Sequence, residues 1–339
     1  MTRAFGCSLT TITILCLAAA SAEANTYTFQ TIDNPGDPNF NQLLGINNEG
    51  TIAGYFGDGM GMVPNNGYTW TKTGGFVAEN FNPSAQTQVV AINNTLANGS
   101  YNTAGFYVDA AGANHGFTQI GGVQNTVDNP LTQSTPNFNQ LLGLNDHNVA
   151  VGVYADSANN MHGYEIDLAA KTIVGITLPS SFNATSFMAA GINNSGWIAG
   201  NYTAAGVTHG FIDENGISKS FDDPNGNGTN TSFFGLNNNG QAVGSFVDAN
   251  GTNGLVYNLA TNTWQTVDDP NQSFTSAFTF NGTTLNGIND LGQVVGFYSD
   301  GTHVNGVLAT ATPEPAPIDF MLLGGVLILG ARLKRKRSV

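Results

Sequence analysis

Acidic side chains recur in one short context, where an Asp precedes Asn-Pro or belongs to an Asp-Asp-Pro triplet. A second set of Asp lies in loops rich in Gly and Asn. Oxygen ligands from flexible loops are the ones that Ca²⁺ uses. The candidate calcium ligands are Asp33, Asp128, Asp223 and Asp269. No copy has the spacing of an EF-hand loop, so solvated turn acids are the alternative.

Paired carboxylates also raise the question of glycoside hydrolysis, which needs two of them about 5–5.5 Å or about 6.5–9.5 Å apart. No feature of the sequence distinguishes such a pair, and the chain contains no nucleophile elbow, HExxH motif or phosphate loop. Three tryptophans offer faces on which sugars could stack, but each lies in a strand pattern that favours packing: Trp70, Trp197 and Trp264. No catalytic residue is therefore assigned.

The elements that position these residues come from six copies of one phrase, of which "GINNEGTIAGYF" is the first. The copies begin at Gly45, Ala91, Gly143, Gly191, Gly235 and Gly287, with 44 to 52 residues between starts. Such a period is typical of a four-stranded propeller blade. In each copy an apolar strand leads into a turn, then an alternating strand, a polar loop, and two further strands. No segment shows a sustained helical period.

The two ends of the repeat region predict how the ring closes. Thr26–Pro35 reads as a fourth-type strand ahead of the first copy, whereas the last copy stops after its third strand, His303–Thr310. An N-terminal strand that completes the last blade removes both open sheet edges. The predicted fold is all-β, a six-bladed β-propeller of four-stranded antiparallel blades whose last blade is closed by the N-terminal strand. An open β-solenoid is the alternative.

Two sets of polar residues recur at equivalent repeat positions. His115, His162 and His209 lie at the start of the third strand. That strand is expected roughly 16 Å from the axis, since the innermost strand lies about 6 Å from it and strands are about 4.8 Å apart. The three His are thus too far apart to share a zinc ion, and we expect them to cap loops. An Asn ends each first strand and either forms a turn or rings one channel mouth and binds a ligand: Asn47, Asn93, Asn145, Asn193, Asn237 and Asn289.

The N-terminus predicts export. Residues 1–24 combine Arg3, an apolar stretch and a small-residue cleavage site at Ala22-Glu23-Ala24, as in a secretory signal peptide. Both cysteines fall inside it, so the mature body has no disulfide framework. Between Asn25 and Thr312 there are three Lys, no Arg and 20 acidic residues, a formal charge of −17. Such a body is a poor partner for nucleic acid or anionic membranes.

The chain ends with three ordered features in residues 312–339. Pro313, Glu314 and Pro315 come first; a short apolar run follows, which includes Phe320, Leu323, Val326 and Leu329; the basic residues are Arg332, Lys334, Arg335, Lys336 and Arg337. The run is shorter than the about 20 residues that span a bilayer. The basic end would hold the cytoplasmic side during export. A temporary stop at the inner membrane is therefore expected, and a plain single-pass anchor is the alternative.

This tail resembles the PEP-CTERM sorting signal of Gram-negative bacteria, and the repeats of residues 25–311 resemble HAF-type extracellular repeats. The first resemblance implies processing by an exosortase and delivery to the cell surface or exopolysaccharide matrix. The second implies no particular activity. The resulting hypothesis is a non-catalytic surface or matrix protein that binds extracellular polysaccharide or another envelope component, with no cofactor beyond a possible calcium ion. The alternative is a secreted carbohydrate-active enzyme.

Overall fold

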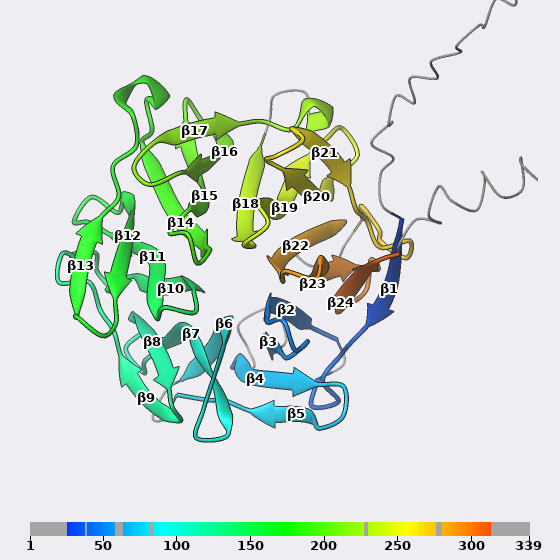
Figure 1. The fold of residues 1–339 in the computed structure, drawn as a ribbon, viewed down its shortest axis with the longest axis horizontal. Coiled ribbons are helices and arrows are strands. Elements are labelled where there is room, and N and C mark those ends of the chain that lie inside the picture. Colours follow the sequence, from blue (N-terminus) through cyan, green and yellow to red (C-terminus); the bar gives the residue numbers. More distant parts are fainter. Residues whose placement is uncertain are drawn as a thin grey trace, which may run out of the picture.

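The computed structural model describes residues 26–37, 39–57, 64–81, 85–226, 230–275 and 280–312. They form six four-stranded antiparallel sheets around a central channel, which confirms the predicted propeller (Figure 1). The predicted signal peptide and the sorting tail from Pro313 onward lie outside the described residues. No helix within the described part of the chain has the length and hydrophobicity needed to cross a bilayer.

The first three blades follow the chain without a crossover. Blade 1 contains β2 (Asn41–Ile46), β3 (Ile52–Phe56), β4 (Asn66–Thr71) and β5 (Gly75–Ala78). Blade 2 contains β6 (Gln86–Ala97), β7 (Ser100–Val108), β8 (Asn114–Ile120) and β9 (Val123–Thr126). Blade 3 contains β10 (Asn139–Leu144), β11 (Val149–Ala155), β12 (Met161–Asp167) and β13 (Thr172–Gly175).

The remaining blades include two short 3₁₀ turns and the closing strand. Blade 4, preceded by η1 (Ser180–Phe182), contains β14 (Ser186–Ile192), β15 (Ile198–Ala204), β16 (Val207–Asp213) and β17 (Ser218–Phe221). Blade 5, preceded by η2 (Pro224–Gly226), contains β18 (Thr231–Leu236), β19 (Gln241–Val247), β20 (Thr252–Asn258) and β21 (Thr263–Thr266). Blade 6 contains β22 (Thr283–Ile288), β23 (Gln293–Ser299), β24 (Val304–Ala311) and the N-terminal β1 (Tyr27–Thr31).

The N-terminal strand closes the ring as the sequence predicts. β1 pairs antiparallel with β24 from Tyr27↔Ala311 to Thr31↔Val307. The backbone N–H of Thr312 donates to the carbonyl of Thr26 at 2.7 Å. Blade 6 is thus held together by segments from both ends of the body, and the two ends lie side by side.

The meander gives the ring two different faces. The turns between first and second strands, and between third and fourth strands, emerge on one side, here called the turn face. The links between blades and the loops between second and third strands emerge on the other, here called the link face. Each first strand begins at the link face and ends at the turn face, so its inward-facing side chains line the channel from one mouth to the other.

The close approach of neighbouring first strands explains why the repeated phrase begins with glycine. Every first strand carries a β-bulge just before this position. A Cβ at Gly45 would lie 2.8 Å from the Val90 carbonyl oxygen, and one at Gly143 would lie 2.6 Å from that of Ala190. Only small residues let neighbouring first strands approach this closely. Blade 2 places Ala91 there.

The predicted third strands supply the core between blades. In each of these strands the apolar residue that follows a glycine is at most 1% exposed: Tyr68, Phe117, Tyr164, Phe211, Leu255 and Val307. Burial of one such side chain contributes about 1.5–3 kcal/mol. The apolar seams between blades therefore provide much of the stability of a body that has no disulfide framework.

Candidate functional site: the two mouths of the channel

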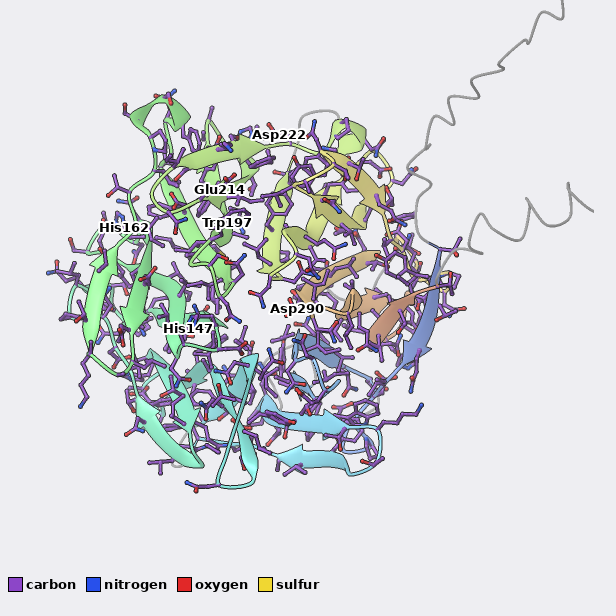
Figure 2. The ribbon with its side chains drawn as sticks, viewed as in Figure 1. His147, His162, Trp197, Glu214, Asp222 and Asp290 are labelled. Atoms are coloured by element: carbon purple, nitrogen blue, oxygen red, sulfur yellow. The ribbon has the colours of Figure 1, made fainter. Side chains whose placement is uncertain are left out.

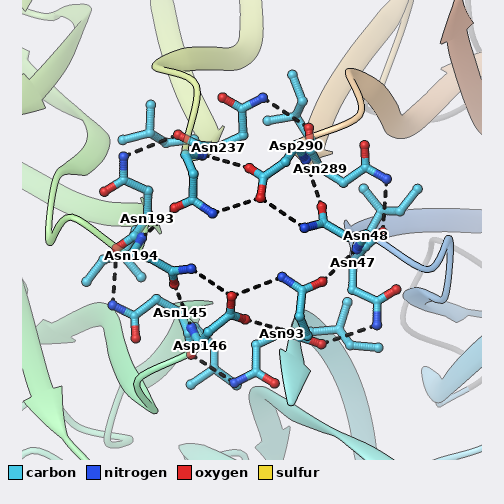
Figure 3. A pocket seen from close by; sticks show the side chains of 18 residues that line it. Asn47, Asn48, Asn93, Asn145, Asp146, Asn193, Asn194, Asn237, Asn289 and Asp290 are labelled. Carbon is cyan, nitrogen blue, oxygen red and sulfur yellow. Dashed lines mark hydrogen bonds between the residues drawn. The ribbon is translucent and has the colours of Figure 1, made fainter. Parts of the chain in front are cut away.

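The turn-face mouth is surrounded by the six Asn that end the first strands (Figure 3). In each turn the Asn carbonyl accepts from the residue three positions on, as in Asn145 O with Asn148 N at 3.1 Å. That fourth residue has positive φ, which Gly and Asn adopt readily: Gly50, Asn148, Gly196, Gly240 and Gly292. The predicted turn role is thus confirmed in five of the six blades. Blade 2 replaces this turn by a longer hairpin with Asn98 and Gly99 at its tip.

The same six Asn also join the blades into one closed ring. Each side-chain Nδ2 donates to the backbone carbonyl of the Asn in the next blade, at 2.8–3.2 Å. The sixth bond, from Asn289 to Asn47, returns to blade 1. The side chains are at most 5% exposed, so these hydrogen bonds are shielded from water. Loss of one would leave a buried donor or acceptor without a partner, which is unfavourable.

A second ring lies one residue further along the chain, and it was missed by sequence reasoning. The backbone N–H at each position donates to the side-chain Oδ1 in the next blade, at 2.7–2.9 Å. Its members are Asn48, Asn94, Asp146, Asn194, Asn238 and Asp290. The signal was present in the phrase, because this position is always Asn or Asp.

The two carboxylates of the second ring stand in blades 3 and 6, opposite each other across the channel. Oδ2 of Asp146 accepts from the amides of Asn94 and Asn194, at 3.0 and 2.7 Å. Oδ2 of Asp290 accepts from the corresponding amides of Asn48 and Asn238 at 2.9 and 2.8 Å. Each acid is therefore flanked by two amide donors, which gives the ring an approximate twofold symmetry (Figure 3).

These bonds keep the Asp146 carboxyl charged. Burial by itself raises the pKa of Asp146, but hydrogen bonds from Asn194 and Asn94 outweigh it and place the pKa below its ordinary value. The enclosed space at this mouth is only about 70 Å³. Because its amides form hydrogen bonds between neighbouring blades, the double ring holds the blades together. We call it the asparagine clasp.

The link-face mouth is wider and chemically different. Its cavity of about 180 Å³ is lined on blades 1 to 3 by Gln42, Gln88 and Gln140. Blades 4 and 5 contribute apolar side chains, which include Met188 and Phe234. The full lining is Gln42, Leu44, Gln88, Val90, Phe106, Gln140, Leu142, Met188, Ala190, Phe234 and Asn286. We call this cavity the glutamine mouth; none of these side chains is titratable.

One buried amide in the glutamine mouth lacks a partner among the described residues. Gln42 is 5% exposed, and its Oε1 accepts from the Tyr55 hydroxyl at 2.8 Å. Its Nε2 has no hydrogen-bond acceptor within the described part of the chain. A buried donor without an acceptor costs about 1–3 kcal/mol, and because this nitrogen has almost no accessible surface, it belongs to the wall of the cavity. The repeated letters "NQLLG" at Asn41 and Asn139 could have indicated this mouth.

The four candidate calcium ligands lie on four different links between blades, all on the link face. Asp33 Oδ1 accepts from Gly306 N at 2.9 Å, and burial raises its pKa to about 6 despite that bond. Asp128 Oδ2 lies 2.8 Å from His115 Nδ1. Asp223 and Asp269 are each 1% exposed and accept from backbone N–H groups two residues on, at 2.8 Å. Burial raises the pKa of both.

These four acids therefore serve as turn acceptors or ion-pair partners in separate places. Among the described residues no three His, Cys, Asp or Glu come together in a group that could hold a metal ion. Calcium binding by the link-face loops stays a prediction.

The recurring histidines bind loop carboxylates. His162 Nε2 lies 2.9 Å from Asp156 Oδ2, and His209 Nδ1 lies 2.8 Å from Asp222 Oδ1. A tyrosine of the second strand packs on each ring, as Tyr202 does on His209 at 5.1 Å. Figure 2 places His162 and Asp222 toward the rim, away from Asp290 at the channel. This arrangement agrees with the expected loop-capping role.

The tryptophans pack within and between blades. Trp264 stacks on Phe233 and lies 4.3 Å from the Tyr257 ring, and Trp70 lies 6.4 Å from the Phe76 ring. Trp197 packs against the core cluster shared by blades 4 and 5. None of the three lines the glutamine mouth.

Comparison with known proteins supports the fold. No known family model matches this chain, and no curated protein sequence matches it. A protein described as TolB from Agrobacterium tumefaciens has a TM-score of 0.51 at 10% identity, covering 86% of this chain and all of its own. A mutant of Aleuria aurantia lectin in complex with Fucα1-6GlcNAc gives 0.51 at 10% identity, with 81% and 96% covered.

TolB from Acinetobacter baumannii has a TM-score of 0.48 at 11% identity and covers 77% of this chain. The chain spans only 64% of the length of that protein. At such low identities the two similarities with a TM-score of 0.51 concern the fold alone. The molecule is a six-bladed β-propeller that resembles TolB and lectin propellers.

Proposed function

We propose that this protein is a non-catalytic component of the cell surface or exopolysaccharide matrix of a Gram-negative bacterium, which binds a neutral glycan in the glutamine mouth. Its signal peptide directs export, and an exosortase sorts it through Pro313, Glu314 and Pro315. The apolar run then holds the chain in the inner membrane only during processing.

The side chains that line the glutamine mouth are the main support for the proposed binding of a neutral glycan. Its lining combines the amide groups of three Gln and one Asn with apolar side chains from blades 1 to 5, and it contains no acid or base. A glycosidase needs two carboxyl groups at its site, whereas recognition of a neutral sugar needs hydroxyl partners and apolar contact. The half-buried side chains of Gln88 and Gln140 supply amide groups that the hydroxyls of such a ligand can meet.

The lectin in the comparison adds limited support. That propeller was solved with a bound fucose-containing disaccharide, so the architecture is compatible with sugar recognition. Fold similarity alone does not transfer a ligand. The location of the site in this chain is inferred from its own side chains.

Filling the glutamine mouth should abolish glycan binding. Ala190 is 3% exposed and lines the cavity, so Ala190→Trp would place an indole in a space of about 180 Å³. We expect at least a tenfold loss of binding on a glycan array. Ala158→Trp, on an exposed link-face loop, is the matched control and should bind as the parent does. Equal binding by both variants would move the site elsewhere, and no bound glycan on the array would remove this ligand class.

Replacing the sorting motif should stop processing. In the native bacterium, Ala at 313, 314 and 315 should leave the tail attached, so the purified protein keeps the mass of residues 313–339 and stays in the membrane fraction. Pro317→Ala is the control outside the motif. If the triple variant reached the matrix with the same mass as the parent, exosortase sorting would be wrong.

A further inference from the structure

A groove of about 660 Å³ lies between blades 2 and 3, separate from the channel. Blade 2 lines it with residues of β8, β9 and the following link, and blade 3 with residues of β12, β13 and the turn between them. It is several times larger than the glutamine mouth and lies within the usual size range of ligand pockets.

Blade 3 carries two aliphatic side chains at the position where blades 1 and 5 carry aromatic pairs. In blade 3 Ile166 pairs with Ile173 across β12 and β13. The equivalent pair is Trp70 with Phe76 in blade 1 and Tyr257 with Trp264 in blade 5. In all three cases the pair packs toward the preceding blade. The aromatic rings fill the seam in blades 1 and 5, and the isoleucines leave it open.

The floor of the groove is aliphatic. Its apolar lining comes from both blades, and four of these five side chains are only half-buried: Ile120, Val127, Ile166, Leu168 and Ile173. No aromatic ring lines the groove, so it lacks a flat face for a sugar. Half-buried aliphatic side chains gain by contact with a hydrocarbon, at about 25 cal/mol per Å² removed from water.

The charges of the groove lie at its two ends. Lys171 is exposed in the turn between β12 and β13, on the turn face, and Asp128 lies on the link face. Asp128 is already bonded to His115 at 2.8 Å. Lys171 forms no ion pair within the described residues, whereas Lys219 is paired with Glu214 at 2.8 Å. Lys72 in blade 1 likewise forms no ion pair among the described residues, so the Lys171 ammonium distinguishes the groove only together with its aliphatic floor.

We propose that the groove between blades 2 and 3 binds an anionic amphiphile with an unbranched hydrocarbon chain, such as a fatty carboxylate. The carboxylate pairs with the Lys171 ammonium, and the chain lies along the aliphatic floor toward blade 2. The hydroxyl of exposed Thr126 and the amide of half-buried Asn148 give the groove a polar rim. This site is independent of the glutamine mouth.

Isothermal titration of the purified full-length protein with decanoate tests the site. We expect saturable binding to the parent, at least tenfold weaker binding of hexanoate, and no binding of decyltrimethylammonium. Lys171→Gln should weaken decanoate binding at least fivefold. Lys72→Gln is the matched control, because Lys72 occupies the corresponding turn of blade 1, where Trp70 and Phe76 fill the seam.

A second variant separates groove filling from charge. Ile166→Trp with Ile173→Phe copies the blade 1 pair into blade 3 and should abolish decanoate binding. Lys171→Gln changes only an exposed side chain, so this variant should fold as the parent does. Equal affinity in Lys171→Gln and the parent, or equal affinity for the cationic amphiphile, would overturn the proposal. So would a failure of the parent to bind decanoate. Glycan binding by Lys171→Gln should be unchanged, which keeps this test distinct from that of the proposed function.

Discussion

Replacement of Asn193 by Ala should lower the free energy of unfolding by about 3 kcal/mol, since three buried hydrogen bonds are lost at about 1 kcal/mol each. Its Oδ1 accepts from Ser195 N and Trp197 N, both at 3.0 Å, and its Nδ2 donates to Asn237 O at 3.2 Å. The side chain is 4% exposed, so water cannot readily replace these partners. Urea denaturation of the parent and the variant measures the difference.

Two further variants of the same turn isolate the cause. Ser195→Ala changes an exposed side chain two residues away and should be neutral within about 0.5 kcal/mol. Asn193→Asp keeps the acceptor within the turn but removes the donor to blade 5, so it should still lose more than about 1 kcal/mol at pH 7. If Asn193→Asp were as stable as the parent, the asparagine clasp would not hold the blades together.

Replacement of Glu79 by Gln should stabilise the protein at pH 8 by about 3 kcal/mol and leave it nearly unchanged at pH 4.5. Glu79 is 6% exposed, and burial raises its pKa to about 7, although the Thr103 hydroxyl donates to Oε1. A pKa raised by about 2.5 units corresponds to about 3 kcal/mol of lost stability once the carboxyl ionises. Gln remains neutral and can still accept from Thr103.

The direction of the pH dependence follows from linkage. Below the unfolded pKa of 4.5 the carboxyl is protonated in both states, so its contribution to stability is fully present. As pH rises through the folded value of about 7 that contribution is lost. The difference between variant and parent should therefore grow from pH 4.5 to pH 8 and then level off.

Urea denaturation at several pH values measures this difference, with Glu49→Gln as the control. Glu49 is exposed on a turn of blade 1, so its removal should give no comparable rise between pH 4.5 and pH 8. A constant difference for Glu79→Gln across this range would show that the Glu79 carboxyl ionises as freely in the folded state as in the unfolded state.

The architecture was predictable because it depends on local patterns that repeat. The phrase that starts at Gly45 specifies a strand, a turn and a second strand, and its six copies set the number of blades. The unmatched strand at Tyr27–Thr31 indicated closure, and the register with β24 confirms it. These inferences need only residue types and order along the chain.

The candidate sites were harder to predict, because they depend on contacts between blades. A single Asn such as Asn47 looks like a turn residue in the sequence, and only the ring shows that its amide also reaches Asn93. The opening beside Ile166 depends on side-chain volumes in two separate blades. Burial of Asp223 likewise follows from how its link packs, which composition does not reveal.

The pairing of Thr312 with Thr26 has a consequence for how the molecule is presented. β1 begins and β24 ends at the turn face, so Thr26 and Thr312 lie together on the clasp side, toward the outer edge of blade 6. Attachment of the body through either end would therefore be on the turn face. The glutamine mouth opens on the link face, so such an attachment would leave it unobstructed.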